Sequence, residues 1–206
     1  MNQTSGNATK QTLLTYLDAQ RQALLWKVDG LDEGALRRPM TPTGTNLLGL
    51  VKHLAAVEYG YFQMSFGRPH PDLPHLRMDA DRMLDFYATA EERADQIIQT
   101  YRDAIAASNQ TCQELPLDAE ARVPWWPEPT TLERLIVHVA VETARHLGHA
   151  DIVREQIDGQ VGLTAANDNM ATADPGFWES HLTMLRTLAK QAEVGALDSV
   201  AGNEQD

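Results

Sequence analysis

The sequence predicts an all-α protein, and three observations support this prediction. Apolar residues recur every three or four positions along most of the chain, as they do on amphipathic helices. No stretch alternates strictly between polar and apolar residues, and no hairpin turn joins two apolar runs. A length of 206 residues is enough for one domain with its own core. We therefore expect one helical-bundle domain over residues 1–194 and a flexible tail at 195–206.

The composition narrows the class of protein. An apolar fraction of 43% and a charged fraction of 22% are ordinary for a soluble globular protein. A formal charge of −12 argues against nucleic acid or an anionic membrane as a partner, because phosphate groups need basic clusters. No apolar run could span a bilayer, and the polar N-terminal segment predicts no signal peptide. The single cysteine, Cys112, fits a reducing cytoplasm, so we expect a cytoplasmic protein without a catalytic cysteine.

Three helical stretches are expected in the first half of the chain. The first covers residues 13–30 and ends at a glycine. The second covers residues 47–66, with Thr45 or Asn46 as its N-cap. The third is expected over residues 79–107, where acidic and basic side chains three or four apart indicate a solvated helix face.

Two further helices are expected in the second half. Residues 108–130 are expected to form a connection that is long for a compact domain. A Thr-x-x-Glu capping box at Thr130 begins the next helix, which ends at Gly159. After a polar connector, Pro175 opens a last helix.

The helix expected over residues 130–159 carries polar side chains on its apolar face. His138, Glu142, His146 and His149 fall within one arc of the helical wheel, together with several aliphatic residues. Burying imidazoles and a carboxylate is costly unless they are paired, hydrogen-bonded or bound to a metal. This helix is therefore the first place to look for a functional site.

These side chains can hold a divalent metal. Glu142 and His146 are four residues apart and project side by side from consecutive turns. His53 is the only other histidine in a strongly apolar helical stripe, so it is the expected third ligand. Three protein ligands leave an open position, as at catalytic sites. Imidazole and carboxylate suit Zn²⁺, Ni²⁺, Fe²⁺ or Mn²⁺, with Zn²⁺ or Ni²⁺ expected first. His149 is expected as a partner of a ligand, a general base or a replacement ligand, and His138 as a bystander.

Spacing alone leaves a plainer interpretation open. A glutamate and a histidine four residues apart also form an ordinary hydrogen bond or ion pair. The His-Glu-x-x-His motif of zinc proteases is absent, and so are the paired Glu-x-x-His motifs of di-iron bundles. Trp126, in the connection before the helix, either forms a pocket wall or closes the end of the bundle.

Two segments together resemble the DinB-like superfamily of four-helix metal proteins. They are NLLGLVKHLAAVEYGYF, in the second expected helix, and HVAVETARHLGHADIVREQIDG, in the fourth. The chain is similar to the branch that includes mycothiol-dependent maleylpyruvate isomerase. The resemblance implies an up-down-down-up four-helix bundle, here with an extra C-terminal helix. It also implies that His53, Glu142 and His146 hold one divalent ion.

The resemblance further implies thiol chemistry. The expected activity is that of a metal-dependent S-transferase or isomerase that uses a low-molecular-weight thiol, such as mycothiol or bacillithiol, on a small electrophile. The metal would keep the bound thiol as a thiolate. His149 is the expected catalytic group, and Arg145, Trp126 and Tyr61 are the expected contacts of the thiol cofactor. The resemblance also allows a homodimer.

Other interpretations use the same residues. The ion could carry a hydroxide for hydrolysis, with His149 as the base. The bundle could bind a metal or small ligand without catalysis, as in a stress response. The cluster could also be a buried polar network whose members only satisfy one another.

Overall fold

The computed structural model describes residues 3–73, 76 and 83–202. The chain divides into two compact units, Met1–Asp168 and Asn169–Asp206. The second unit contains α6 (Pro175–Gly202), which begins at the proline predicted from the sequence. The single domain over residues 1–194 and the flexibility of the tail stay predictions.

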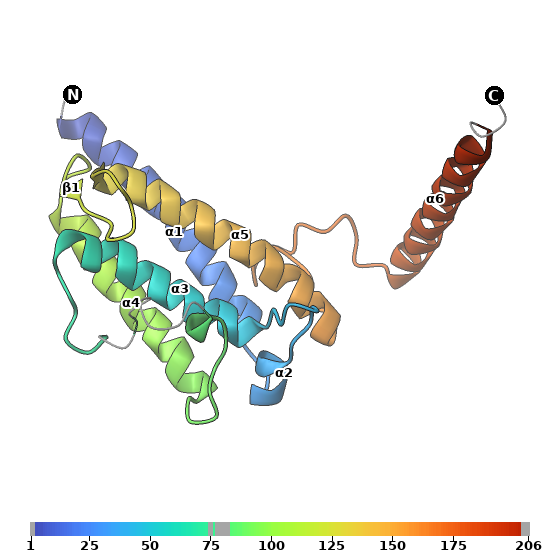
Figure 1. Ribbon diagram of the computed structural model, residues 1–206, viewed down its shortest axis with the longest axis horizontal. Coiled ribbons are helices and arrows are strands. Elements are labelled where there is room, and N and C mark those ends of the chain that lie inside the picture. Colours follow the sequence, from blue (N-terminus) through green and yellow to red (C-terminus); the bar gives the residue numbers. More distant parts are fainter. Residues whose placement is uncertain (1–2, 74–75, 77–82, 203–206) are drawn as a thin grey trace. The chain divides into compact units, whose positions relative to one another are not determined.

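Four long helices form the first unit (Figure 1). They are α1 (Gln3–Val28), α3 (Leu47–Phe62), α4 (Ala94–Glu114) and α5 (Leu132–Asp158). α1 packs against α5, and α3 packs against both α4 and α5. α3 and α4 run in one direction, and α1 and α5 run in the other, so the order is up-down-down-up. The predicted all-α bundle with an extra C-terminal helix is confirmed.

Short elements connect the long helices. α2 (Glu33–Arg37), η1 (Met64–Phe66) and η3 (Leu84–Phe86) are helical turns. β1 (Glu120–Ala121) and β2 (Thr130–Thr131) form a small antiparallel ladder before α5. The sequence did not indicate this ladder, because two-residue strands are too short to show alternation.

The helix ends follow local capping rules, with one correction. Asn46 caps α3 as predicted, since its Oδ1 accepts a hydrogen bond from the Gly49 amide at 2.7 Å. α5 ends at Gly159 as predicted, in the left-handed conformation with φ 79°. The capping box at Thr130 is wrong by one residue. Thr131, the last residue of β2, caps α5 by accepting from the Arg134 amide at 3.4 Å.

Two helix boundaries differ from the predictions. α1 already begins at Gln3 instead of residue 13. α4 covers Ala94–Glu114, whereas the sequence predicted residues 79–107, of which 79–82 lie outside the described residues. The end of α4 looks polar in sequence, yet Ser108, Thr111 and Cys112 are buried on its inner face. Those small side chains let the helix continue where a loop was expected.

A buried ion pair ties three helices together. Arg21 of α1 donates two hydrogen bonds to Glu58 of α3, each of 2.7 Å, and both side chains are buried. Arg21 also donates to Asn109 of α4 at 2.8 Å. These bonds satisfy a charged pair inside the core, which would otherwise be costly.

Two findings bear on the expected environment of the protein. None of the helices in the described part of the chain combines the length and hydropathy needed to cross a membrane. Cys112 is buried, and burial raises the pKa of its thiol to about 12. The thiol is therefore protonated at neutral pH. The cytoplasmic location and the absence of a nucleic-acid partner stay predictions.

Candidate metal centre

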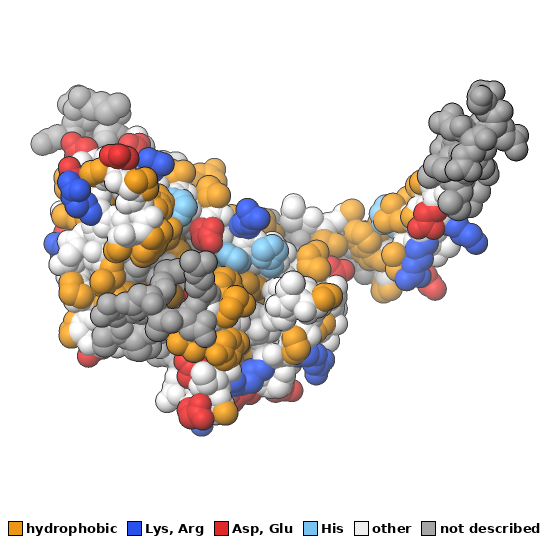
Figure 2. Space-filling model, in the orientation of Figure 1, with side chains coloured by type: hydrophobic (Ala, Val, Ile, Leu, Met, Phe, Trp, Pro, Cys, Tyr) orange, Lys and Arg blue, Asp and Glu red, His pale blue; other side chains and the backbone are white. Residues whose placement is uncertain are grey.

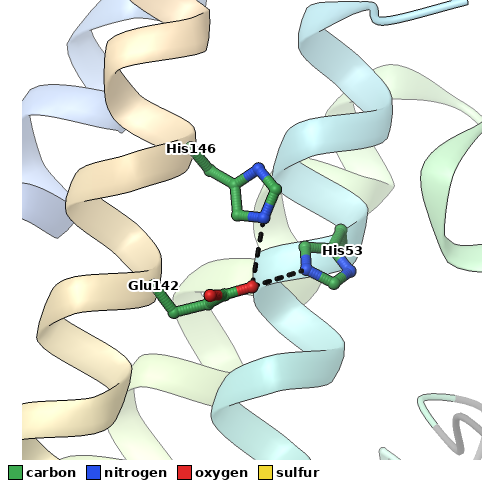
Figure 3. A group of neighbouring side chains, drawn as sticks. All are labelled: His53, Glu142 and His146. Atoms are coloured by element: carbon green, nitrogen blue, oxygen red, sulfur yellow. Dashed lines mark hydrogen bonds and ion pairs between the residues drawn. The ribbon is translucent and has the colours of Figure 1, made fainter. Parts of the chain in front are cut away.

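His53, Glu142 and His146 form one cluster between α3 and α5 (Figure 3). Glu142 Oε1 lies 3.2 Å from His146 Nε2 and 3.6 Å from His53 Nε2. One ligand atom from each residue lies within 4.8 Å of the other two. α5 supplies two neighbours from consecutive turns, and the packing of α3 against α5 supplies the third. The structure thus brings together all three residues predicted as ligands.

Asp85, from η3, orients the His53 ring. Its Oδ2 lies 2.7 Å from His53 Nδ1, which is short, as expected for a hydrogen bond to a charged acceptor. Because the carboxylate can only accept, Nδ1 carries the proton and Nε2 presents its lone pair toward Glu142. Phe86 stacks on the same ring, with 4.2 Å between centroids and 18° between planes. Two neighbouring residues of one turn therefore fix both the tautomer and the plane of His53.

An unsatisfied nitrogen atom of the cluster fits a bound cation. His53 Nε2 is buried and has no hydrogen-bond partner among the described residues. An orphaned buried group costs about 1–3 kcal/mol. Ligand atoms around a tetrahedral Zn²⁺ lie about 3.3 Å apart, given bonds of about 2.0–2.2 Å. The observed 3.2 and 3.6 Å around Glu142 Oε1 are close to that spacing. The two imidazoles and the carboxylate are thus suited to Zn²⁺ or a similar divalent ion.

The electrostatics of the cluster favour the protonation states that a metal requires. Burial opposes ionisation of Glu142, but His146 and His53 outweigh it and hold the pKa of its carboxyl below the usual 4.5. Burial and the neighbouring His53 lower the pKa of His146 below the usual 6.5. A carboxylate therefore lies beside a neutral imidazole at neutral pH, and both can coordinate without losing a proton first.

An aromatic group adjoins the cluster, one turn earlier on α5. His138 Nε2 lies 2.9 Å from the hydroxyl of Tyr61 on α3. Trp126 packs edge-on against His138 and near Tyr61, with ring centroids 5.1 and 5.8 Å away. Trp125, which is half exposed, also contacts Tyr61 at 5.3 Å. We call these four residues the aromatic group. His138, expected as a bystander, is the member that joins α5 to Trp126.

A cavity of about 460 Å³ opens on the other side of the cluster, one turn later on α5. His146 and His149 line it together with the Thr43–Asn46 loop, Leu50 of α3, and Met83, Phe86 and Tyr87 in and beside η3. Figure 2 shows histidine side chains gathered on one face of the bundle, beside a carboxylate and next to hydrophobic side chains. The cluster therefore has a neighbouring space of the size that small ligands occupy, typically about 300–1,000 Å³.

A family model described as Mycothiol-S-transferase matches residues 12–159. The matched range holds the three clustered residues, the aromatic group and nearly all of the four-helix bundle. The chain belongs to the mycothiol-S-transferase family. This family is DinB-like, so the resemblance seen in the sequences of α3 and α5 is confirmed. A comparison with curated proteins gives no match.

In this member of the mycothiol-S-transferase family, the other predicted site residues lie outside the three-residue cluster. His149 is exposed, lines the cavity, and lies 5.4 Å from His146 between ring centroids. Tyr61 and Trp126 belong to the aromatic group, and burial raises the pKa of the Tyr61 hydroxyl. Arg145 is exposed. Arg154 is buried and donates hydrogen bonds to Asp158 and to two carbonyls at the end of α1, so its role is structural.

Sequence reasoning missed Asp85 and Phe86, both of which contact His53. They lie in a segment that the sequence predicted as the start of a helix, and no local pattern links that segment to α3. Gly49 is the one signal that could have helped. A Cβ at this position would lie 1.9 Å from the Phe86 carbonyl oxygen, so this helical glycine marks the close approach of η3 to α3.

Proposed function

We propose that the protein is a divalent-metal-dependent S-transferase that joins mycothiol to a small electrophile. The observation that carries the proposal is the three-donor cluster of His53, Glu142 and His146, inside the range matched by the mycothiol-S-transferase family. Membership in the family supports mycothiol as the thiol substrate. The two imidazoles and the carboxylate of the cluster support the binding of a divalent metal. Zn²⁺ or Ni²⁺ is the expected ion.

In this proposal the cluster residues hold the ion and do not react themselves. A divalent ion at this position would act as a Lewis acid that lowers the pKa of a bound thiol, which supplies a thiolate nucleophile at neutral pH. Asp85 keeps the His53 tautomer that leaves Nε2 free to coordinate. Glu142 supplies the anionic donor between the two imidazoles.

The remaining predicted residues bind the thiol cofactor and move its proton. Tyr61 and Trp126 offer aromatic faces and a hydroxyl to the sugar portion of mycothiol, and exposed Arg145 offers a cation. His149 accepts the thiol proton, as an exposed imidazole beside His146 can do. A bond forms between the thiol sulfur and the electrophilic carbon, and the leaving group departs with its electron pair.

The test is conjugation of mycothiol to 4-nitrobenzyl chloride, followed by mass spectrometry of the thioether. The wild type is expected to accelerate the reaction when loaded with Zn²⁺ or Ni²⁺ and to lose activity with a chelator. His53→Ala should lower the rate by more than the roughly 10–100-fold typical of changes around metal ligands. His181→Ala, which removes a histidine of α6, serves as the control and should keep full activity.

The same assay separates the other uses of the site. If the protein conjugates bacillithiol but not mycothiol, the proposed thiol cofactor is wrong and the proposed S-transfer reaction is right. Metal-dependent ester hydrolysis, with no conjugation to either thiol, would contradict the transferase proposal in favour of a hydrolase. No reaction by a protein that retains one ion would favour a non-catalytic metal-binding bundle.

A further inference from the structure

The segment that brings Asp85 and Phe86 to His53 is held in place by side chains of other elements. It continues from η3 through residues 87–93, which lie outside any helix or strand, to the start of α4. Backbone carbonyls in such a segment need hydrogen-bond partners from elsewhere. Four consecutive carbonyls accept from side chains of α2, of α3 and of the N-cap of α3: those of Phe86, Tyr87, Ala88 and Thr89. The position of Asp85 therefore depends on the residues that bind these carbonyls.

Arg37, the last residue of α2, binds three carbonyls of this segment. Its Nη1 donates to the carbonyls of Ala88 and Thr89, each at 3.0 Å, and its Nη2 donates to the Glu92 carbonyl. Its Nε and Nη2 also donate to Glu33, one turn earlier on α2, at 3.0 and 2.7 Å. A guanidinium presents five donors in a fixed planar geometry, and the Glu33 carboxylate orients that plane. Arg37 thus ties the segment to α2.

Lys52 provides a second anchor, from α3. It directly precedes His53, and its ammonium donates to the Tyr87 carbonyl at 3.0 Å and to the Glu92 carboxylate at 2.8 Å. The same carboxylate oxygen accepts from the Thr89 amide at 2.7 Å. Burial opposes ionisation of Glu92, but Lys52 and the Thr89 amide outweigh it and hold the pKa of the carboxyl below the usual 4.5. Glu92 is therefore charged at neutral pH and pairs with Lys52 as an ion pair.

Asp85 and Phe86 lie directly before the anchored carbonyls of residues 87–89. The Asp85 carboxylate lies 2.7 Å from His53 Nδ1, and the Phe86 ring stacks on the His53 ring. A hydrogen bond weakens steeply as it loses alignment, so the contact with His53 needs the segment to stay in place. Partners that orient a metal-binding histidine typically contribute about 10–100-fold to metal affinity. Residues that fix the segment can therefore affect metal binding from a distance.

We propose that Arg37 and Lys52 are positioning residues of the metal centre, and that they act through Asp85. They hold the carbonyls that follow η3 and thereby keep the Asp85 carboxylate on His53 Nδ1. Neither residue belongs to the cluster or lines the cavity beside it. The inference rests on the proposed function, because it takes His53 as a ligand of the divalent ion.

The metal affinity of the full-length protein tests this role. Competition against a chromophoric chelator for Zn²⁺ compares Arg37→Met with Arg38→Met, which makes the same change at the next residue, an exposed one. We expect Arg37→Met to weaken binding about tenfold and Arg38→Met to leave it unchanged. Arg37→Lys should recover part of the loss, because an ammonium can still donate to some of the carbonyls. Equal affinities of Arg37→Met and Arg38→Met would overturn the proposal.

A double-mutant cycle shows whether Arg37 acts through Asp85. In Asp85→Ala the contact with His53 is already lost, so adding Arg37→Met should change the metal affinity by less than about twofold. Two residues that act independently would instead have effects that multiply. A further tenfold loss in the double variant would therefore contradict the proposed route through Asp85.

Hydrogen exchange of the metal-free protein tests the anchors without any ion. Amides of residues 83–92 should exchange several-fold faster in Arg37→Met than in Arg38→Met, because the segment opens more often without its anchor. Lys52→Met should have the same effect, and it provides the comparison if Arg37→Met does not fold. Its control is Lys190→Met, on the exposed part of α6. Unchanged exchange in the anchor variants would overturn the anchoring role.

The affinity measurements also separate this inference from the proposed function. A wild type that binds no divalent ion would refute the proposed function and the positioning role with it. A wild type that binds one ion, with the same affinity in Arg37→Met and Lys52→Met, would refute the positioning role alone.

Discussion

At the scale of single residues, the three residues that cluster between α3 and α5 could be predicted from the sequence, and the residue that orients His53 could not. His53, Glu142 and His146 lie in helices, so the 3.6-residue period indicates which way they project. Asp85 reaches His53 only through the packing of η3 on α3, a contact between segments 32 residues apart. No periodic pattern carries that information.

Asp85→Asn is expected to weaken metal binding about 10–100-fold, because an amide is a poorer acceptor for the His53 Nδ1 proton and no longer fixes the tautomer. Competition against a chromophoric chelator measures the affinity. Asp103→Asn, on the exposed face of α4, is the control and should bind metal as the wild type does. Equal affinities for wild type and Asp85→Asn would mean that Asp85 is only a packing residue.

His138 should make the stability of the metal-free protein depend on pH. Burial lowers its pKa below the usual 6.5, so the unfolded chain binds more protons at this residue than the folded protein. The contribution of neutral His138 to the free energy of unfolding is fully present above pH 6.5. It is lost as the pH falls from 6.5 through the lowered pKa of the folded protein. His138→Gln should therefore lose less stability than the wild type between about pH 7.5 and about pH 5.5. Urea unfolding with a chelator checks this, and an equal or larger loss in the variant would contradict it.

At the scale of elements, helix identity was easier to predict than helix boundaries. The caps of α3 and the end of α5 follow from residues with strong local preferences, Asn46 and Gly159. The limits of α4 were wrong because its last turns are polar in sequence and buried by tertiary contacts. The wall of the cavity depends on another tertiary contact, the approach of η3 to Gly49.

Gly49→Ala is expected to destabilise the protein by about 1–3 kcal/mol, because the new Cβ would meet the Phe86 backbone at 1.9 Å. Gly148→Ala is the matched control. A Cβ at this exposed position on α5 meets nothing within 4 Å, so the change should stabilise the helix by about 0.5–1 kcal/mol.

Urea unfolding gives both free energies. Because Phe86 and Asp85 contact His53, Gly49→Ala should also weaken metal binding more than Gly148→Ala does. Equal stabilities of the two variants would show that η3 moves away from the new methyl group at little cost and is not held firmly against α3.

At the scale of the whole molecule, the bundle topology was predictable and its internal anchor was not. Helical periodicity predicted an all-α protein, and the resemblance of two of its segments to a known superfamily implied the up-down-down-up order. Nothing local shows that Arg21 and Glu58, both charged, are buried partners in the core. The homodimer and the cytoplasmic location stay predictions.

Arg21→Met is expected to cost about 3–5 kcal/mol, because it leaves the Glu58 carboxylate buried without its partner. The double variant Arg21→Met with Glu58→Leu should recover much of that loss, since no buried charge is left unpaired. Chemical denaturation of the wild type and the two variants measures the change in free energy of unfolding for each variant. A double variant less stable than Arg21→Met would contradict this account of the core.

The central claim is that His53, Glu142 and His146 hold one divalent ion. The most direct measurement is elemental analysis of protein purified without a histidine tag, for the wild type and for His53→Ala. The account predicts about one equivalent of Zn²⁺ or Ni²⁺ per chain in the wild type, as at three-ligand catalytic sites, and little in the folded variant. A small fraction of one equivalent in the wild type, unchanged in His53→Ala, would contradict it.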